Sequence, residues 1–507
     1  MRPWPSCAPW PTKHATPADF CAALWFDGSM GSIDEDPGLP LKLWPCSNGE
    51  YLPPPLDELR AEALRRARAS ADDHARRHGW SRRRFLMSAA GMAAGLGALE
   101  SASADRSRAL GLERGGAFRV GRSAAADIAE ANDLVHGAAG GAGVVDVQTH
   151  FLEFGPWGQG FPQSSCGEAD WADCFSVEYW YDLVLGGSDT SIAVISAVPV
   201  VGEADPLSVA AMERGRELAT RICGDGRVLI QGHAVPDVGP IDAALASMSD
   251  VAAAHALCAW KVYTHSPNGW FLDDHDPALP QVGAPFIEAV RNTGVGVVAV
   301  HKGLAGGNPY ASPVDIGPAA AANPDVRFLV YHSGYDTGTA EGPYDPDGSG
   351  VDRLVRSVTE AGLGPGGNVY AELGSTWRIV MGSPDVAAHV LGKLLTALGP
   401  ERILWGTDSI WYGSPQDQIA AFRAFEITPA YQEQFGYPAL TTEMKDRIMA
   451  ANAAELFGLT VPPPACEPAA IAAGIDRSNR TLGPVARRDV FATFFREHPW
   501  IAAAAES

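Results

Sequence analysis

The strongest constraint on the fold is a regular alternation of short apolar runs and longer amphipathic segments that begins at Val144. Eight runs rich in valine and isoleucine cover residues 144–150, 191–199, 228–235, 259–264, 295–302, 327–332, 368–373 and 402–408. Segments with helical periodicity lie between them, including 206–222, 241–256, 285–293, 351–361 and 385–398. Eight strand–helix units predict an α/β fold with a closed (β/α)8 TIM barrel. An open doubly wound sheet is the alternative, but no glycine-rich phosphate loop follows the first run.

The chain of 507 residues is longer than one barrel, which uses about 250 residues. We therefore expect an N-terminal extension (1–104), a barrel (140–460) and a C-terminal extension (461–507). A hydrophobic content of 46% and a charged content of 19% are those of a globular protein with a large core.

The charge of the chain restricts its partners. The formal net charge is −22, and all of the acidic excess follows residue 104, because residues 1–104 hold 12 basic and 12 acidic residues. An acidic body repels phosphate backbones, which argues against nucleic-acid binding. We expect a small-molecule substrate, and a homo-oligomer is compatible with the sequence.

Four of the predicted strands end in side chains that bind metals. His150, His301, His332 and Asp408 stand at or next to the carboxyl ends of the first, fifth, sixth and eighth runs. In a barrel these ends share one mouth, so the four side chains become neighbours. Imidazoles and a carboxylate suit one divalent metal ion, with zinc as the expected ion.

The arrangement over residues 144–459 resembles the amidohydrolase-related group of metal-dependent barrels. Its members include hydrolases and non-oxidative decarboxylases of the aminocarboxymuconate-semialdehyde type. The resemblance is carried by Asp146-Val-Gln148-Thr-His150, by His301, by Tyr-His-Ser-Gly around His332, by Gly-Thr-Asp ending at Asp408, and by a closing helix over 451–459. It implies that His150, His301 and Asp408 hold the metal.

The chain departs from that family at Gln148, where the first-strand signature Asp-x-His-x-His places a histidine. A glutamine amide offers only a neutral oxygen, so we expect Gln148 to be a weak ligand or to contact a ligand. Lys261 matches a position where some related enzymes carry a carboxylated lysine that bridges two metals. A lysine that is hydrogen-bonded inside the barrel is the alternative for Lys261.

A divalent ion with an open position lowers the pKa of bound water and polarises a carbonyl or carboxylate. Asp408 could both bind the ion and accept the proton of the water, and His332 is placed for general acid–base catalysis. Arg378 and Lys302 are candidates for pairing with a substrate carboxylate, and Trp157 is a further candidate for substrate contact. Local acidic residues are the alternative partners of Arg378 and Lys302.

Three functions fit these residues. The first is hydrolysis of an amide, lactone or ester by metal-activated water. The second is non-oxidative decarboxylation, in which the metal binds the substrate and His332 delivers a proton to carbon. The third is a barrel that binds a ligand without turnover because Gln148 has weakened the metal site.

The sequence of the N-terminal extension predicts a structure unlike that of the barrel. Residues 1–56 are rich in proline and tryptophan and predict an irregular or weakly ordered segment, whereas 56–79 predict an arginine-rich helix. Ser-Arg-Arg-Arg-Phe-Leu-Met at 81–87 resembles the twin-arginine export motif, and an apolar stretch and Ala-Ser-Ala at 102–104 follow it. We expect export through the twin-arginine machinery to the periplasm or another extracytoplasmic space, with removal of 1–104. A cytoplasmic protein with a buried alanine-rich helix is the alternative.

Two long connections, 151–190 and 333–368, leave the predicted catalytic face and are candidate lids. Their aromatic residues could instead only pack the loops. Cys166 and Cys174 lie in the first connection and could pair in an oxidising compartment.

Overall fold

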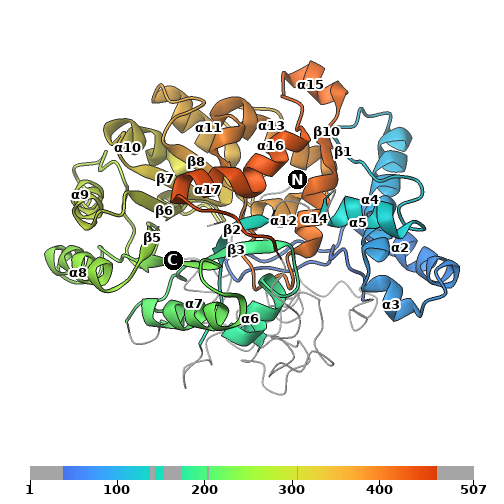
Figure 1. Cartoon of the computed structure of the whole chain (residues 1–507). Helices are drawn as coiled ribbons and strands as arrows, with labels where there is room; N and C mark the ends of the chain where they lie inside the picture. The colour runs from blue at the N-terminus through green and yellow to red at the C-terminus, as the bar shows by residue number, and fades with distance from the viewer. Residues whose placement is uncertain (1–37, 138–142, 154–173, 203–204, 305, 465–507) are drawn as a thin grey trace, which may run out of the picture.

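The computed structural model describes residues 38–137, 143–153, 174–202, 205–304 and 306–464. Within this part of the chain, eight parallel strands form one sheet in sequence order (Figure 1). They are β2 (Val144–Thr149), β3 (Thr190–Ile195), β4 (Val228–His233), β5 (Leu257–Tyr263), β6 (Val297–His301), β7 (Arg327–Tyr331), β8 (Val369–Glu372) and β9 (Ile403–Leu404). The eight predicted strands are confirmed.

The sheet closes between its first and last strands. The Val147 N–H donates to the Trp405 carbonyl at 3.0 Å, and a parallel bridge joins Thr149 to Ser409. This contact makes the sheet a barrel, so the predicted TIM barrel is confirmed and the open doubly wound sheet is excluded.

Helices connect the strands and cover the outside of the barrel (Figure 1). They include α6 (Val177–Val184), α7 (Val209–Cys223), α8 (Ile241–Ala254), α9 (Gly283–Thr293), α10 (Ile316–Ala322), α11 (Val351–Glu360), α12 (Thr376–Val380), α13 (Pro384–Leu398), α14 (Gln416–Ala424), α15 (Pro429–Phe435), α16 (Thr442–Asp446) and α17 (Asn452–Phe457). The five predicted helices correspond to α7, α8, α9, α11 and α13.

Alternation along the strands divides the apolar side chains into two sets. One set forms a cluster shared by all eight strands, with members such as Val147, Val194, Ala299 and Leu329, and it fills the barrel. The neighbouring residues of the same strands, such as Val298, pack with the helices. Ala450 and Ala453, near the end of the barrel, belong to the cluster that fills it. The Asn452 amide donates to the Ile403 carbonyl at the start of β9, at the end of the barrel opposite to the predicted metal ligands.

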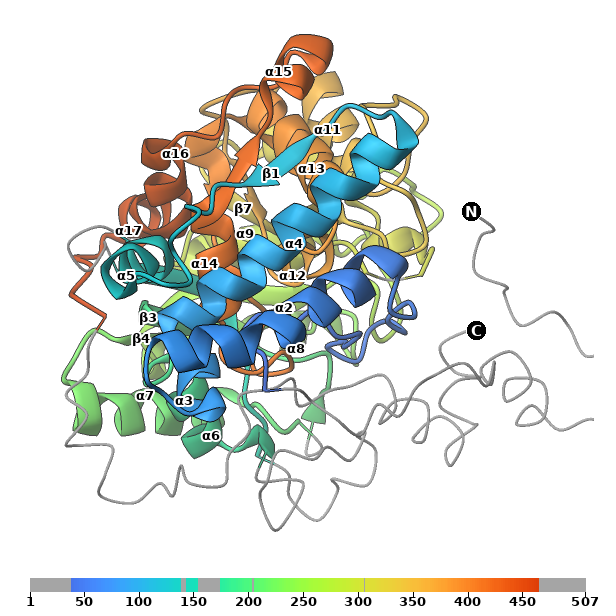
Figure 2. The ribbon, with the colours of Figure 1, turned by 90° about the vertical axis from the view of Figure 1, so that its right-hand side faces the viewer.

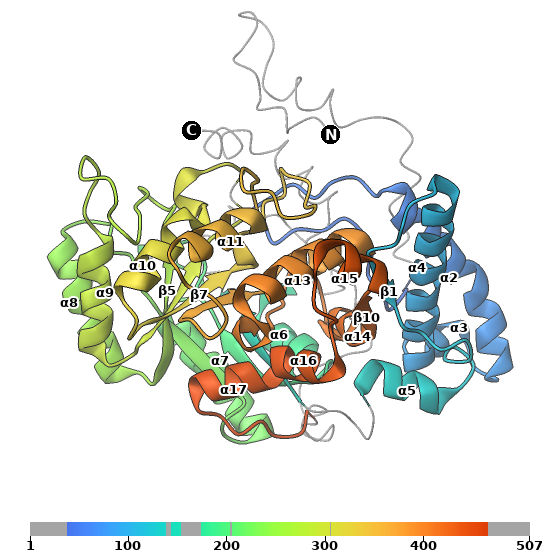
Figure 3. The same cartoon turned by 90° about the horizontal axis from the view of Figure 1, so that it is seen from above.

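The N-terminal extension packs on one side of the barrel and runs beyond the expected boundary at residue 104, to the end of α5. It contains α2 (Glu58–Arg77), α3 (Arg82–Leu86), α4 (Ala89–Leu110) and α5 (Ile128–His136), and α2 and α4 lie side by side (Figures 2 and 3). Strand β1 (Gly116–Phe118) pairs antiparallel with β10 (Phe425–Ile427), which ties the extension to the last part of the barrel. The predicted arginine-rich helix is confirmed as α2.

The segment with the export motif is folded into this layer. It forms α3 and α4, in which Phe85, Leu96 and Leu99 are fully buried. The expected cleavage point after Ala104 therefore falls inside α4. Among the described residues, none of the helices combines the length and apolar character needed to cross a membrane. Export itself stays a prediction.

The state of the cysteines bears on the prediction of export. Cys174 and Cys223 are disulfide-bonded, whereas Cys46 and Cys258 are free thiols. Cys166 lies outside the described residues, so its expected pairing with Cys174 stays a prediction.

We predict that Leu99→Ala lowers the free energy of unfolding by about 2–5 kcal/mol, because it removes a fully buried side chain from the hydrophobic core to which α4 contributes. Chemical denaturation of the uncleaved chain measures this change. Leu110→Ala is the matched control, since Leu110 belongs to the same helix but is 59% exposed, and its effect should stay within about 0.5 kcal/mol. Equal effects of the two substitutions would show that α4 does not pack as described.

Candidate metal centre

His301 and His332 face each other at the tips of β6 and β7. Their ring centroids are 4.6 Å apart, and both side chains are buried. His332 Nδ1 lies 2.8 Å from the Gly374 carbonyl, which can only accept a hydrogen bond, so Nδ1 carries the proton and Nε2 has a free lone pair. Neither Nε2 atom has a hydrogen-bond partner within the described ranges.

His150 and Asp408 form a second pair on the other side of the mouth. His150 Nδ1 lies 2.7 Å from the Ser196 carbonyl, so this nitrogen is a donor as well. His150 Nε2 then faces Asp408 Oδ1 at 3.0 Å. Two lone pairs at this distance repel unless the ring is doubly protonated or one cation binds both atoms. Binding of one cation to both atoms would make the pair two ligands of one metal.

Several of these residues have strained backbones. His332 and Asp408 lie in the left-handed region with φ of 64° and 58°, as does Ser375 with φ of 54°. Such conformations cost about 1–3 kcal/mol each and persist where the surroundings enforce them. They also explain why the predicted runs 327–332 and 402–408 end in turns instead of strands.

A segment of the N-terminal extension reaches into the mouth. We call residues 38–51 the arm. Within it, Asn48 Nδ2 donates to Asp408 Oδ2 at 2.8 Å and to Glu50 Oε2 at 2.5 Å. Glu50 Oε1 lies 2.6 Å from His301 Nε2, and Glu50 Oε2 lies 3.8 Å from His332 Nε2. The ligand atoms of Glu50, His301 and His332 all lie within 4.8 Å of one another, which makes these three residues a candidate metal site.

The arm is held by buried polar contacts. Lys42 Nζ forms an ion pair with Asp417 at 2.8 Å. Arg378 Nη2 donates to the Trp44 carbonyl and to Cys46 Sγ, both at 3.0 Å. The arm is irregular, as its composition predicts, but it is packed, because most of its residues from Leu39 to Tyr51 are buried.

Burial and hydrogen bonding set the charges of the ligands. Burial lowers the pKa of His301 well below its usual value and lowers that of His332, which keeps both rings in the neutral form that binds metals. Burial opposes ionisation of Asp408, but the adjacent His150 ring outweighs it and leaves the pKa of Asp408 below its usual value. The carboxylate is thus the stable form.

Two further carboxylates shape the site without facing its centre. Asp146 accepts hydrogen bonds from the backbone N–H groups of Gln148 and Thr407, and burial raises its pKa to about 7. Glu372 accepts from the backbone N–H of His332 at 3.1 Å, and burial raises its pKa to about 8. The β-carbon of any residue larger than glycine at Gly374 would clash with Gln148 Oε1 and Glu372 Oε1, so both side chains would have to move.

Gln148 lies among the ligands. Its Nε2 donates to Asp408 Oδ1 at 3.1 Å and lies 3.5 Å from His150 Nε2. Its Oε1 is buried and has no hydrogen-bond partner in the described chain. The weak-ligand role of Gln148 stays a prediction.

Lys261 is buried on β5, with Nζ 3.7 Å from the centroid of the Tyr331 ring and 4.6 Å from that of Tyr263. Burial lowers the pKa of its ammonium group to about 7. Nζ has no hydrogen-bond partner among the residues that the structure describes. The carboxylated form stays a prediction.

The structure gives the candidate substrate residues other partners. Arg378 binds the arm, and Lys302 Nζ contacts Asp315 and the Tyr310 carbonyl, both at 2.8 Å. Trp157 lies outside the described residues, as does much of the first candidate lid. In the described part of that connection, Tyr179, Trp180 and Tyr181 are fully buried and pack its helix.

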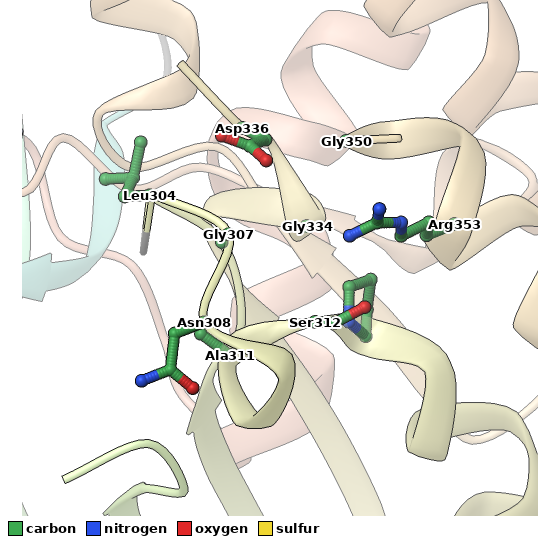
Figure 4. Close-up of a pocket in the computed structure, with 11 residues that line it drawn as sticks. Leu304, Gly307, Asn308, Ala311, Ser312, Gly334, Asp336, Gly350 and Arg353 are labelled. Atoms are coloured by element: carbon green, nitrogen blue, oxygen red, sulfur yellow. The ribbon is translucent and has the colours of Figure 1, made fainter. Parts of the chain in front are cut away.

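A separate hollow lies beside the turns that follow His301 and His332 (Figure 4). It is lined by Asn308 and Ser312 from one turn, by Asp336 from the other and by Arg353 of α11. None of the candidate ligands lines it.

Sequence reasoning did not single out Asn48 and Glu50. Asn-Gly at 48–49 indicates a turn, and Gly49 does adopt a φ of 101°. Nothing local indicates the partner of that turn, because Asn48 contacts Asp408 across 360 positions of the sequence.

Comparison with known proteins gives a family and several similar folds. Residues 145–459 match the sequence profile of the family described as Amidohydrolase. Comparison with curated proteins gives no match. Among solved structures, the chain is similar to an uncharacterized TIM-barrel protein from Bordetella bronchiseptica (14% identity, TM-score 0.42, covering 62% of this chain and 98% of that one). It is also similar to 5-carboxyvanillate decarboxylase from Sphingomonas paucimobilis (12% identity, TM-score 0.34, covering 63% of this chain and 100% of that one). A third similar structure is dihydroorotase from Campylobacter jejuni (13% identity, TM-score 0.34, covering 63% of this chain and 84% of that one).

We predict that Arg378→Ala loosens the arm, because the Trp44 carbonyl and the Cys46 thiol lose a charged donor worth about 1.5–3 kcal/mol. Limited proteolysis followed by mass spectrometry should show faster cleavage within residues 38–51. Arg65→Ala is the control, since the Arg65 side chain is 73% exposed and its ion pair with Glu62 lies outside the arm. An unchanged cleavage rate in Arg378→Ala would show that Arg378 does not anchor the arm.

Proposed function

The chain belongs to the amidohydrolase family, and we propose that within this family it is a metal-dependent hydrolase that cleaves an amide, a lactone or an ester. The observation that carries the proposal is the set of imidazole nitrogens and carboxylate oxygens that face one another at the mouth. His150 Nε2 and Asp408 Oδ1 are 3.0 Å apart, and His301 Nε2 and Glu50 Oε1 are 2.6 Å apart.

The residues fit a divalent metal on chemical grounds. His301 Nε2, His332 Nε2 and Gln148 Oε1 are buried polar atoms without hydrogen-bond partners in the described part of the chain, and such atoms are costly unless something binds them. Imidazole nitrogens with a carboxylate are the donor set that zinc prefers. We propose that His150, His301 and Asp408 hold one zinc ion, with Gln148 as a weak contact.

A zinc ion in this position would lower the pKa of water and polarise a substrate carbonyl. Asp408 is placed to take the proton of the attacking water, because its carboxylate is the stable form. His332 Nε2, which has a free lone pair, is placed to accept a proton and pass it to the leaving group, while Nδ1 stays fixed on the Gly374 carbonyl.

We also propose that the protein works outside the cytoplasm after twin-arginine export. The support is the motif at 81–87 and the disulfide-bonded state of Cys174 and Cys223, because disulfides persist in oxidising compartments. Cell fractionation of the native host tests this, and a protein found only in the cytoplasm would overturn it.

We predict that purified protein holds about one divalent metal per chain and that His301→Ala lowers this content to a small fraction of it, because the ring is buried among the other ligands. Elemental analysis measures the content, and circular dichroism checks the fold. His275→Ala is the control, since the His275 side chain is 46% exposed. A wild-type protein without metal would refute the proposed function. If the protein released carbon dioxide from a carboxylated substrate without consuming water, it would be a decarboxylase and the proposal of a hydrolase would be wrong.

We predict that Gln148→His raises metal affinity by roughly 10-fold or more, because an imidazole is a better ligand than an amide oxygen and changes around a metal are commonly worth 10–100-fold. Competition with a chelator measures the affinity. Equal affinity in wild type and variant would mean that position 148 does not face the metal.

A further inference from the structure

We infer that Glu50, supplied by the arm, is a ligand of the metal and compensates for the missing imidazole at position 148. The inference rests on the proposed function. It adds a residue from outside the region that matches the family, because Glu50 lies about 95 positions before residue 145.

Geometry places the Glu50 carboxylate between the two free imidazoles. Oε1 lies 2.6 Å from His301 Nε2, and Oε2 lies 3.8 Å from His332 Nε2. The approach to His301 lacks hydrogen-bond geometry, so both Nε2 atoms stay without a partner in the described residues. These atoms gather within 4.8 Å without satisfying one another, as atoms around a common cation do, with Glu50 Oε1 and His301 Nε2 as its ligands and His332 Nε2 beside them.

The arm holds Glu50 in place before any ligand binds. The Glu50 backbone N–H donates to Asn48 Oδ1 at 3.0 Å, and the Asn48 amide also donates to Glu50 Oε2. Asn48 further donates to Asp408 Oδ2, so one side chain fixes the distance between the Glu50 and Asp408 carboxylates. Orientation by such outer partners is what tunes a metal ligand.

Charge gives a reason for a carboxylate in this place. With a neutral amide at Gln148, the barrel strands contribute only the imidazole rings of His150 and His301 and one carboxylate, that of Asp408. Glu50 adds a second negative charge, and its side chain is 21% exposed, so the desolvation cost is smaller than for a fully buried group. A dication is therefore better neutralised with the arm than without it.

Removal of residues 1–104 would take Glu50 and Asn48 away from the mouth, together with α2 and most of α4. We therefore expect a protein without residues 1–104 to bind the metal more weakly than the full-length chain.

Glu50→Gln tests the inference, because it keeps the size of the side chain and removes its charge. We expect zinc affinity, measured by competition with a chelator on the full-length protein, to fall by at least 10-fold. The visible spectrum of the protein loaded with Co²⁺ should change as well, since it reports directly on the ligands. Glu360→Gln is the control, because Glu360 is exposed at the end of α11, and both readouts should stay as in wild type.

Unchanged affinity and an unchanged Co²⁺ spectrum in Glu50→Gln would overturn the inference. If His301→Ala still lost its metal, the proposed function would stand. Tighter zinc binding in Glu50→Gln would overturn the inference as well, since Glu50 would then block the site. If Glu50→Gln does not fold, Glu50→Asp, which keeps the charge and retracts it, should show a smaller loss of affinity together with an altered Co²⁺ spectrum. Wild-type affinity and spectrum in Glu50→Asp would count against Glu50 as a ligand.

Discussion

Closure of the barrel between β2 and β9 is the constraint on which the candidate site depends. The Asp146 carboxylate accepts hydrogen bonds from Gln148 N–H on its own strand and from Thr407 N–H beyond β9. The Asp408 N–H then donates to the Gln148 carbonyl at 2.9 Å. These contacts join the two ends of the sheet and set His150 and Asp408 opposite each other. Without closure, the first and last ligands of the sequence would stand at opposite edges of an open sheet.

The backbone conformation at the ends of the strands orients the side chains of the candidate site. Left-handed backbones at His332 and Asp408 turn their side chains at the ends of the strands, where an extended residue would continue along the sheet. Glu372, held by the His332 N–H, and the Gly374 carbonyl, bound by His332 Nδ1, stabilise that turn. The cost of the strain is offset by these buried hydrogen bonds. The same bonds fix which nitrogen of His332 is free for chemistry.

The arm shows how a segment outside the barrel becomes part of its centre. It has no regular secondary structure of its own around Asn48, yet it is fixed by the Lys42–Asp417 ion pair and by Arg378. Arg378, which the sequence offered as a substrate contact, is occupied by backbone and thiol atoms of the arm. The arm therefore connects the layer of α2 and α4 with the mouth of the barrel.

The sequence by itself determined the barrel, because strand and helix periodicities are local and eight repeats of them leave one closed architecture. It also determined that His150, His301, His332 and Asp408 stand at strand tips, since register follows from the apolar runs. Only the tertiary structure decided which side chains join them. Asn48 and Glu50 lie in a proline-rich segment without periodicity, and their contacts with Asp408 and His301 span hundreds of residues. Such contacts depend on packing between segments that are far apart in the sequence, and local sequence patterns do not predict that packing.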